Sequence, residues 1–183
     1  MNKDIRLFNP ADLITCRTPQ GAQVRLRRDA LRFRPGAYGI AFNAARTHVL
    51  LTRTTGVGVW ELPGGAIELG EPAAAAAARE FTEETGVPVT VDEPVTFNQD
   101  FFVWSEAETE GWATINLFFL VTPQRDPDPR YRETGAGATN YGARWIALDR
   151  LEEIAMLAHH YDAVQRALEW VEYREGPAED DEE

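Results

Sequence analysis

Short apolar runs recur along the chain from residue 37 onward, and residues that favour turns separate them. Runs of this length, rich in Val, Ile, Leu, Phe and Trp, are typical of strands. They predict strands at 37–43, 47–54, 57–62, 87–91, 94–104, 111–121 and 143–148. The strands at 94–104 and 111–121 flank the acidic turn 105–110, which predicts a hairpin.

Helical patterns stand between and after these strands. Pro72 suits the first position of a helix, Ala73–Ala78 is a strong helix-forming run, and Gly86 suits the left-handed residue that ends one. Asp149 is expected to cap a second, short helix. Apolar positions at helical spacing predict a third helix over 159–173, with its buried side at Tyr161, Val164, Leu168 and Val171. Strands interleaved with helices predict a mixed α/β (α+β) fold.

The first of these helices carries a cluster of carboxylates. Glu80, Glu83 and Glu84 are spaced i, i+3 and i+4, so their side chains share one face of the helix. Like charges at this spacing weaken a helix unless a divalent cation binds between them. Carboxylate oxygens are the ligands that Mg²⁺ and Mn²⁺ prefer. A solvated acidic helix face is the simpler alternative.

The residues around this cluster match a longer pattern. Gly65 is followed by Glu71 after five residues and by Arg79-Glu80 after seven more, and then by Phe81, Glu83, Glu84, Gly86 and Val87. This spacing resembles the Nudix box, G-x5-E-x7-R-E-U-x-E-E-x-G-U, where U is a bulky apolar residue. The resemblance to Nudix hydrolases implies a mixed β-sheet sandwiched between helices, with the box forming a loop, a helix and a loop.

The same resemblance implies a reaction and its ligands. Nudix hydrolases cleave the diphosphate linkage of a nucleoside diphosphate joined to another group, with Mg²⁺ or Mn²⁺. By match to the box, Glu80 and Glu84 are the expected metal ligands, and Glu83 is a further ligand or a residue that positions water. The backbone carbonyl of Gly64 is a candidate ligand, and an ordinary turn is the alternative for this glycine.

The roles of Arg79 and Glu71 stay open. Arg79 is a candidate for binding substrate phosphate, but in the family pattern this pair more often holds the loop against the helix, which we favour. The box does not fix the general base, which we expect to be a box glutamate or a distal one. Outside the box we favour Glu133 in the long loop 122–142. The other candidates are Glu106, Glu108 and Glu110.

Aromatic residues near the box are candidates for stacking on a nucleobase, although packing is the commoner role of such residues. Trp60 and Glu61 precede the box, and Trp104 lies on the predicted hairpin with Phe101, Phe102 and Trp112. We expect Trp60, Glu61 and Trp104 to contact substrate. The histidines have no spacing typical of metal ligands and are expected to be structural; they are His48, His159 and His160.

The substrate is less defined than the reaction. Position 102 holds Phe where ADP-ribose enzymes of the family have proline nearby, and position 104 holds Trp where dinucleoside polyphosphate enzymes have tyrosine. A nucleoside triphosphate or related nucleotide is the leading hypothesis. The alternatives are an ADP-ribose or nucleotide-sugar pyrophosphatase, and a nucleotide-sensing Nudix domain without turnover.

Composition sets the remaining expectations. The chain has 183 residues and a net charge of −12, which disfavours nucleic acid as a partner. A single cysteine, Cys16, and the lack of a long apolar run predict a soluble cytoplasmic protein without a membrane segment. We expect an N-terminal extension or hairpin at 1–36, a Nudix hydrolase domain at 37–175 and an acidic disordered tail at 176–183. The arginine-rich segment 25–34 is a candidate to cap the domain, to contact a second subunit in a homodimer or to approach the substrate, with an exposed arginine face as the alternative.

Overall fold

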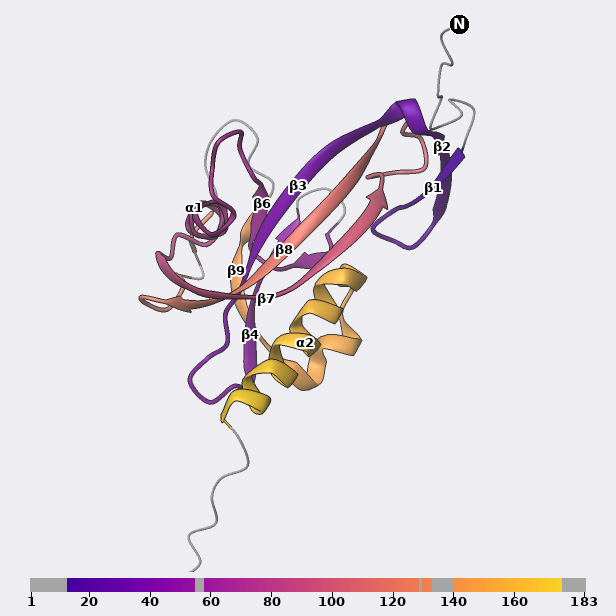
Figure 1. Cartoon of the computed structure of the whole chain (residues 1–183). Coiled ribbons are helices and arrows are strands. Elements are labelled where there is room, and N and C mark those ends of the chain that lie inside the picture. Colours follow the sequence, from indigo (N-terminus) through magenta and orange to yellow (C-terminus); the bar gives the residue numbers. More distant parts are fainter. Residues whose placement is uncertain (1–12, 55–57, 129, 133–139, 176–183) are drawn as a thin grey trace, which may run out of the picture. The chain divides into compact units, whose positions relative to one another are not determined.

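The computed structural model describes residues 13–54, 58–128, 130–132 and 140–175 (Figure 1). The predicted tail at 176–183, residues 1–12 of the predicted extension, and Glu133 lie outside these residues. The two α-helices are α1 (Ala73–Thr85) and α2 (Ala158–Glu175), and the 3₁₀ helices are η1 (Arg28–Ala30) and η2 (Leu148–Glu153). The strands are β1 (Leu13–Arg17), β2 (Gln23–Arg27), β3 (Leu31–Ile40), β4 (His48–Thr54), β5 (Trp60–Glu61), β6 (Gly64–Ala66), β7 (Val89–Phe102), β8 (Gly111–Pro123) and β9 (Asn140–Ala147).

The chain forms two compact units. The first comprises residues 1–34 and 99–115, and the second comprises residues 35–98 and 116–183. Strands β3, β7 and β8 each begin in one unit and end in the other.

The first unit is built on an antiparallel β1–β2 hairpin. Leu13 pairs with Arg27 and Arg17 pairs with Gln23. Buried Cys16 and Leu26 form a small core with Val103. Because side chains alternate along a strand, the arginines on either side of Leu26 face outward. This agrees with the exposed-arginine alternative for this segment, and the homodimer contact stays a prediction.

The second unit is a layered α+β structure whose strands bury both faces. On β4, Leu50 packs with Phe81 of α1, whereas Val49 and Leu51 pack with Val164 of α2. Figure 1 shows α1 and α2 on either side of β4 and β9. The period-two alternation of side chains therefore places a helix against each face, and the predicted sandwich of sheet and helices is confirmed.

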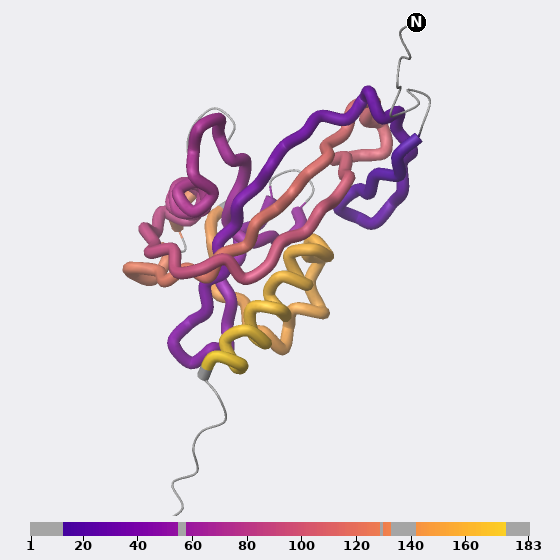
Figure 2. The backbone as a smooth tube through the Cα atoms, in the orientation of Figure 1, coloured from indigo at the N-terminus to yellow at the C-terminus, as the bar shows by residue number. Residues whose placement is uncertain are grey.

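Strand pairing in the second unit positions the residues of the Nudix box. The short strand β6 runs antiparallel to β3, with Tyr38 opposite Gly64 and Ala37 opposite Gly65. Strand β4 pairs with β5 on one side and with β9 on the other. Figure 2, in the orientation of Figure 1, traces the chain from β6 into α1.

Two strand predictions were wrong in extent. Residues 89–102 form one strand, β7, rather than two, and Pro94 lies inside it. Strand β1 pairs with β7 at Arg17 and Phe102, far along β7 from Pro94. The β1 side of β7 is therefore an edge at Pro94, and an edge tolerates the missing N–H of proline. The strand predicted at 57–62 is reduced to β5, because Gly58 has φ +69° and closes a turn with Thr54.

Two predictions about helix ends were also wrong. Pro72 has ψ 140° and precedes α1 instead of opening it. Asp149 does not cap a helix, because it lies inside η2, which begins after Ala147 without a side-chain cap. The left-handed Gly86 at the end of α1 is as predicted, with φ +71°. Over the described residues, neither helix has the length and apolar character needed to cross a bilayer.

Candidate active site

Helix α1 presents its carboxylates because its opposite side is anchored in the core. Ala76, Ala77 and Phe81 are fully buried in the cluster that includes Leu50. The N–H of Gly86 donates to the carbonyl of Thr82 at 2.8 Å, which ends the helix. With the alanine side packed, Glu80 and Glu84 of α1 face the Gly64–Gly65 segment of β6.

Glu84 is the most buried of these carboxylates, with 5% of its surface exposed. Its Oε2 accepts the Gly64 N–H at 3.0 Å and the Thr52 hydroxyl at 3.5 Å. Thr52 is itself fully buried on β4. These two bonds orient the Glu84 carboxylate.

The two glycines at the start of β6 bring the backbone close to its neighbours. A Cβ at Gly65 would lie 2.6–2.8 Å from the carboxyl atoms of Glu80. A Cβ at Gly64 would lie 2.4 Å from the carbonyl oxygen of Ala37 on β3. Glu80 and Glu84 therefore both reach the Gly64–Gly65 segment, from successive turns of α1.

Arg79 ties the loop before α1 to the helix. Its Nε and Nη2 each donate to the carboxylate of Glu71 at 2.9 Å, and Nη2 also donates to the Ala66 carbonyl at 3.1 Å. Nη1 lies 2.9 Å from Glu80 and 3.3 Å from Glu83. The bidentate bond from Arg79, assisted by the Glu68 N–H, lowers the pKa of Glu71 to about 2, and the same bond raises the pKa of Arg79.

Glu83 is oriented differently from the other two carboxylates of the cluster. Its side chain is 54% exposed and is paired with Arg79. Its backbone carbonyl accepts the Tyr131 hydroxyl at 2.7 Å, and the Tyr131 ring also lies against Gly86. Within the described part of the chain, no three acidic, histidine or cysteine side chains converge in an arrangement that would hold a metal ion. The structure thus brings Glu80 and Glu84 to one segment and leaves Glu83 beside Arg79.

The chemistry of the donor set nevertheless fits a divalent cation. Three carboxylates contact the Arg79 guanidinium, which leaves two negative charges, and these are Glu71, Glu80 and Glu83. Glu84 adds a further carboxylate at Gly64. The cradle at Gly65, which a Cβ would fill, is occupied by the Glu80 carboxylate. Hard cations prefer such oxygen ligands.

The other predicted residues are more dispersed. Trp60 pairs through its backbone with Ala155 and Leu157, and the Arg53 guanidinium lies 5.9 Å from its ring. The carboxylate of Glu61 accepts the Thr54 hydroxyl at 2.6 Å. Trp104 belongs to the first unit, where it contacts Phe102 edge to face.

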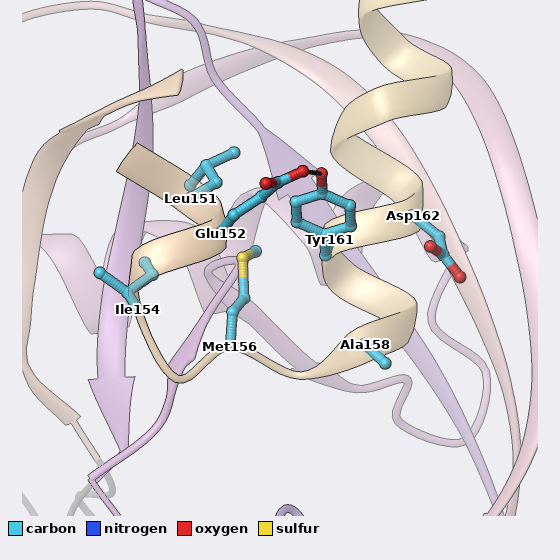
Figure 3. Close-up of a pocket in the computed structure, with 7 residues that line it drawn as sticks. All are labelled: Leu151, Glu152, Ile154, Met156, Ala158, Tyr161 and Asp162. Atoms are coloured by element: carbon cyan, nitrogen blue, oxygen red, sulfur yellow. Dashed lines mark hydrogen bonds between the residues drawn. The ribbon is translucent and has the colours of Figure 1, made fainter. Parts of the chain in front are cut away.

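A pocket of about 370 Å³ lies between η2 and α2 (Figure 3). The Tyr161 hydroxyl donates to Glu152 at 3.3 Å across it. The lining residues are Leu151, Glu152, Ile154, Met156, Ala158, Tyr161 and Asp162. None of these seven is among the predicted site residues.

Sequence reasoning missed several residues that support the carboxylates. Thr52 was part of an apolar strand pattern, and its only signal was a hydroxyl at a position expected to be buried. Tyr131 belongs to the loop 122–142, where no periodicity indicates which residue returns to α1. The bond from the Leu62 N–H to His160 joins residues far apart in the sequence. A histidine on the apolar side of a predicted helix was the available signal.

Fold and site together define an α+β protein with a glutamate-bearing helix beside the Gly64–Gly65 segment, the glycine turn that opens β6. The NUDIX domain family matches residues 32–171, which is well over half of the chain. This chain therefore belongs to the NUDIX domain family, as its box predicted.

Relatives and solved structures agree with this assignment. A MutT-like protein of Streptomyces ambofaciens is 51% identical over 45 residues, 25% of this chain and 29% of the relative. An RNA pyrophosphohydrolase of Roseobacter denitrificans is 38% identical over 72 residues, 39% of this chain and 38% of the relative. The chain thus spans well under half the length of these curated relatives. A NUDIX hydrolase structure from Nitrosomonas europaea has a TM-score of 0.58 at 15% identity, over 76% of this chain and 90% of that one, which shows the fold.

Proposed function

We propose that this chain hydrolyses the diphosphate linkage of a nucleotide with Mg²⁺ or Mn²⁺, and that the substrate is a nucleoside triphosphate or a related nucleotide. The observation that carries the proposal is the arrangement of Glu80 and Glu84. Both reach the Gly64–Gly65 segment from one face of α1, and Glu84 is held there while almost fully buried. A purely structural surface helix has no need of a buried, oriented carboxylate beside a second one.

In this proposal Glu80, Glu84 and the Gly64 carbonyl would hold the cation, and Glu83 would join them after leaving Arg79. A divalent cation bound there would neutralise the diphosphate oxygens and lower the pKa of bound water. The Gly64 N–H and Thr52 hydroxyl keep the Glu84 carboxylate oriented. Arg79 keeps the loop 66–71 against α1 through its two bonds to Glu71.

A carboxylate is the proposed general base. Glu83 is exposed and is held only by its pairing with Arg79 among its described side-chain contacts, so it can turn toward a water. Glu133 is the distal candidate. Trp60, Glu61 and Trp104 stay proposed substrate contacts.

The relatives support the same class of reaction by their names. One is called an RNA pyrophosphohydrolase and another a MutT-like protein. For this chain the linkage and substrate are our proposal, and a panel of nucleotides assayed with Mg²⁺ and with Mn²⁺ tests both. Pyrophosphate released from nucleoside triphosphates is the expected result. AMP formed from ADP-ribose would move the substrate to the alternative class. Tight binding without products would contradict hydrolysis.

A cytoplasmic location and a homodimer belong to the same proposal. The single cysteine, Cys16, is buried and fits a reducing compartment. The exposed arginines of β2 are the proposed dimer contact. Sedimentation of the full chain over a range of concentrations would show a dimer, and Arg25→Glu should weaken it. A monomer at every concentration would contradict this part.

A further inference from the structure

The segment that enters the glycine turn is held at three successive residues. The Leu62 N–H donates to Nδ1 of His160 at 2.9 Å. The Pro63 carbonyl accepts the Gly39 N–H at 2.9 Å. The Gly64 N–H donates to Glu84 at 3.0 Å. One short stretch of backbone is therefore fixed in turn by α2, β3 and α1.

His160 is fully buried at its contact with this segment. Its ring lies 4.6 Å from the Tyr38 ring and 5.5 Å from the Phe118 ring, both at steep angles. Burial, with a smaller effect of His159, lowers the pKa of His160 well below its ordinary value. The imidazole is therefore neutral at physiological pH, and Nδ1 keeps the lone pair that accepts the Leu62 N–H.

His160 also contacts Tyr38, whose ring packs against Gly64. Tyr38 pairs with Gly64 across β3 and β6. A Cβ added to Gly64 would lie 2.5 Å from Cδ1 of the Tyr38 ring. His160 thus supports Gly64 through the backbone of Leu62 and through the ring of Tyr38.

Packing alone does not explain an imidazole at this position. Among the described residues, Nε2 of His160 is buried without a hydrogen-bond partner, which costs free energy. A phenylalanine ring would fill similar space and make the same aromatic contacts without an unpaired donor. What phenylalanine lacks is the acceptor for the Leu62 N–H.

We propose that His160 is a positioning residue of the active site, which fixes the Leu62–Gly64 backbone so that the Gly64 N–H and carbonyl stand in register with Glu84. Where it concerns turnover, this inference rests on the proposed hydrolase function. It assigns to α2, which carries none of the box residues, a direct part in aligning them.

Three variants of the full-length protein separate positioning from general stability. His160→Phe keeps a ring and removes the acceptor. His160→Asn places an amide group near the position of Nδ1 and can restore the acceptor. Val164→Ala leaves a cavity one helical turn away, in the core cluster that includes Tyr38 and Phe118, and leaves the acceptor in place. Amide hydrogen exchange measured by NMR reports the opening of Leu62 and Gly64 relative to the amide of Leu50 in β4.

In His160→Phe, the Gly64 amide is expected to exchange about tenfold faster relative to Leu50, the effect of losing one hydrogen bond. His160→Asn should return Gly64 toward the wild-type rate, and Val164→Ala should change Gly64 and Leu50 together. The inference is overturned if His160→Phe speeds only Leu62, or if Val164→Ala has the same effect on Gly64. Should the Phe variant not fold, Asn must protect Gly64 better than Gln, whose amide reaches the Nε2 position instead.

Turnover provides a second measurement. His160→Phe should lower kcat about tenfold with little change in KM for the nucleotide, and Asn should restore part of the loss. An unchanged kcat in an active enzyme would overturn the positioning role. If the wild-type protein hydrolyses no nucleotide in the panel, the proposed function fails, while the exchange of Gly64 still decides whether His160 positions it.

Discussion

Helices α1 and α2 each send one buried polar side chain to the same short segment, but the two side chains differ in charge. Glu84 of α1 accepts the Gly64 N–H, and His160 of α2 accepts the Leu62 N–H two residues earlier. Beside Glu84, the Glu80 carboxylate reaches Gly65 and is itself paired with Arg79, whereas around His160 lie the rings of Tyr38 and Phe118. One end of the segment is ionic and the other is aromatic and neutral.

This difference shows how the fold can tolerate excess negative charge at one place. An ionised carboxylate can stay buried only when hydrogen bonds or a cation stabilise it. The Gly64 N–H can meet Glu84 only if its backbone is held rigidly, and neutral groups can do this without adding charge to the site. The α2 side therefore stabilises the geometry, and the α1 side keeps the charge that a divalent cation requires.

The largest expected effect is the loss of turnover when the charge of Glu84 is removed. Glu84→Gln keeps the shape and an acceptor for Gly64 but removes the charge, so turnover with Mg²⁺ should fall about 10²- to 10³-fold while the fold survives. Steady-state kinetics and circular dichroism measure both outcomes. Glu169→Gln, which changes an exposed carboxylate of α2, is the matched control and should leave turnover unchanged. Undiminished activity of Glu84→Gln would remove Glu84 from the mechanism.

The next effect distinguishes the two adjacent glycines. In Gly64→Ala the new methyl would meet the backbone oxygen of Ala37 at 2.4 Å, so urea unfolding should show a loss of about 3 kcal/mol. In Gly65→Ala it would meet the end of the flexible Glu80 side chain, so stability should fall by about 1 kcal/mol or less. Activity should still drop in Gly65→Ala, because Glu80 is displaced. Equal stability of the two variants would contradict the close approach at Gly64.

A third prediction concerns His160 and the pH dependence of the free energy of unfolding. The pKa of His160 lies well below 6.5 in the folded protein because the ring is buried, with a smaller effect of His159. The unfolded chain therefore binds more protons below pH 6.5, and the free energy of unfolding should fall as pH falls, by at most about 1.4 kcal/mol per pH unit. Urea unfolding at pH 7.5 and 5.5 should show this fall, and it should be smaller in His160→Asn. The same fall in both proteins would contradict a depressed pKa of His160.

The smallest effect concerns the ion pair that holds the loop against α1. The pKa of Glu71 is about 2, below its ordinary 4.5, because Arg79 and the Glu68 N–H bind the ionised form. Its stabilising effect is fully present above pH 4.5 and is lost as pH falls toward 2. Glu71→Gln should therefore reduce the acid sensitivity of unfolding in that range. Thermal unfolding between pH 5 and pH 3 measures it, and identical profiles of variant and wild type would contradict the shift.

Local patterns predicted the elements of the second unit well where one physical signal dominated. Strand β4 and helix α2 follow from apolar periodicity, and Gly86 follows from the need for a left-handed residue. The boundaries failed where pairing overrides propensity, as at Pro94, which continues as part of β7. They also failed where one glycine closes a turn, as Gly58 does before β5.

Local spacing likewise predicted only part of the candidate site. Spacing along one helix put Glu80, Glu83 and Glu84 on one face, but it did not show that Arg79 retains Glu83. Interactions along a helix depend on rotamers, and three acidic side chains share one guanidinium. The roles of Thr52 and Tyr131 required knowledge of contacts across the fold.

By itself, the sequence determined the family, the carboxylate helix and the glycines that precede it, because these depend on residue identity at fixed short spacing. Only the tertiary structure decided which carboxylate is buried and which faces Arg79, and that a histidine nearly a hundred positions downstream supports the same turn. The physical reason is that burial and hydrogen-bond partnership arise from packing between distant segments, which no local pattern of residues specifies.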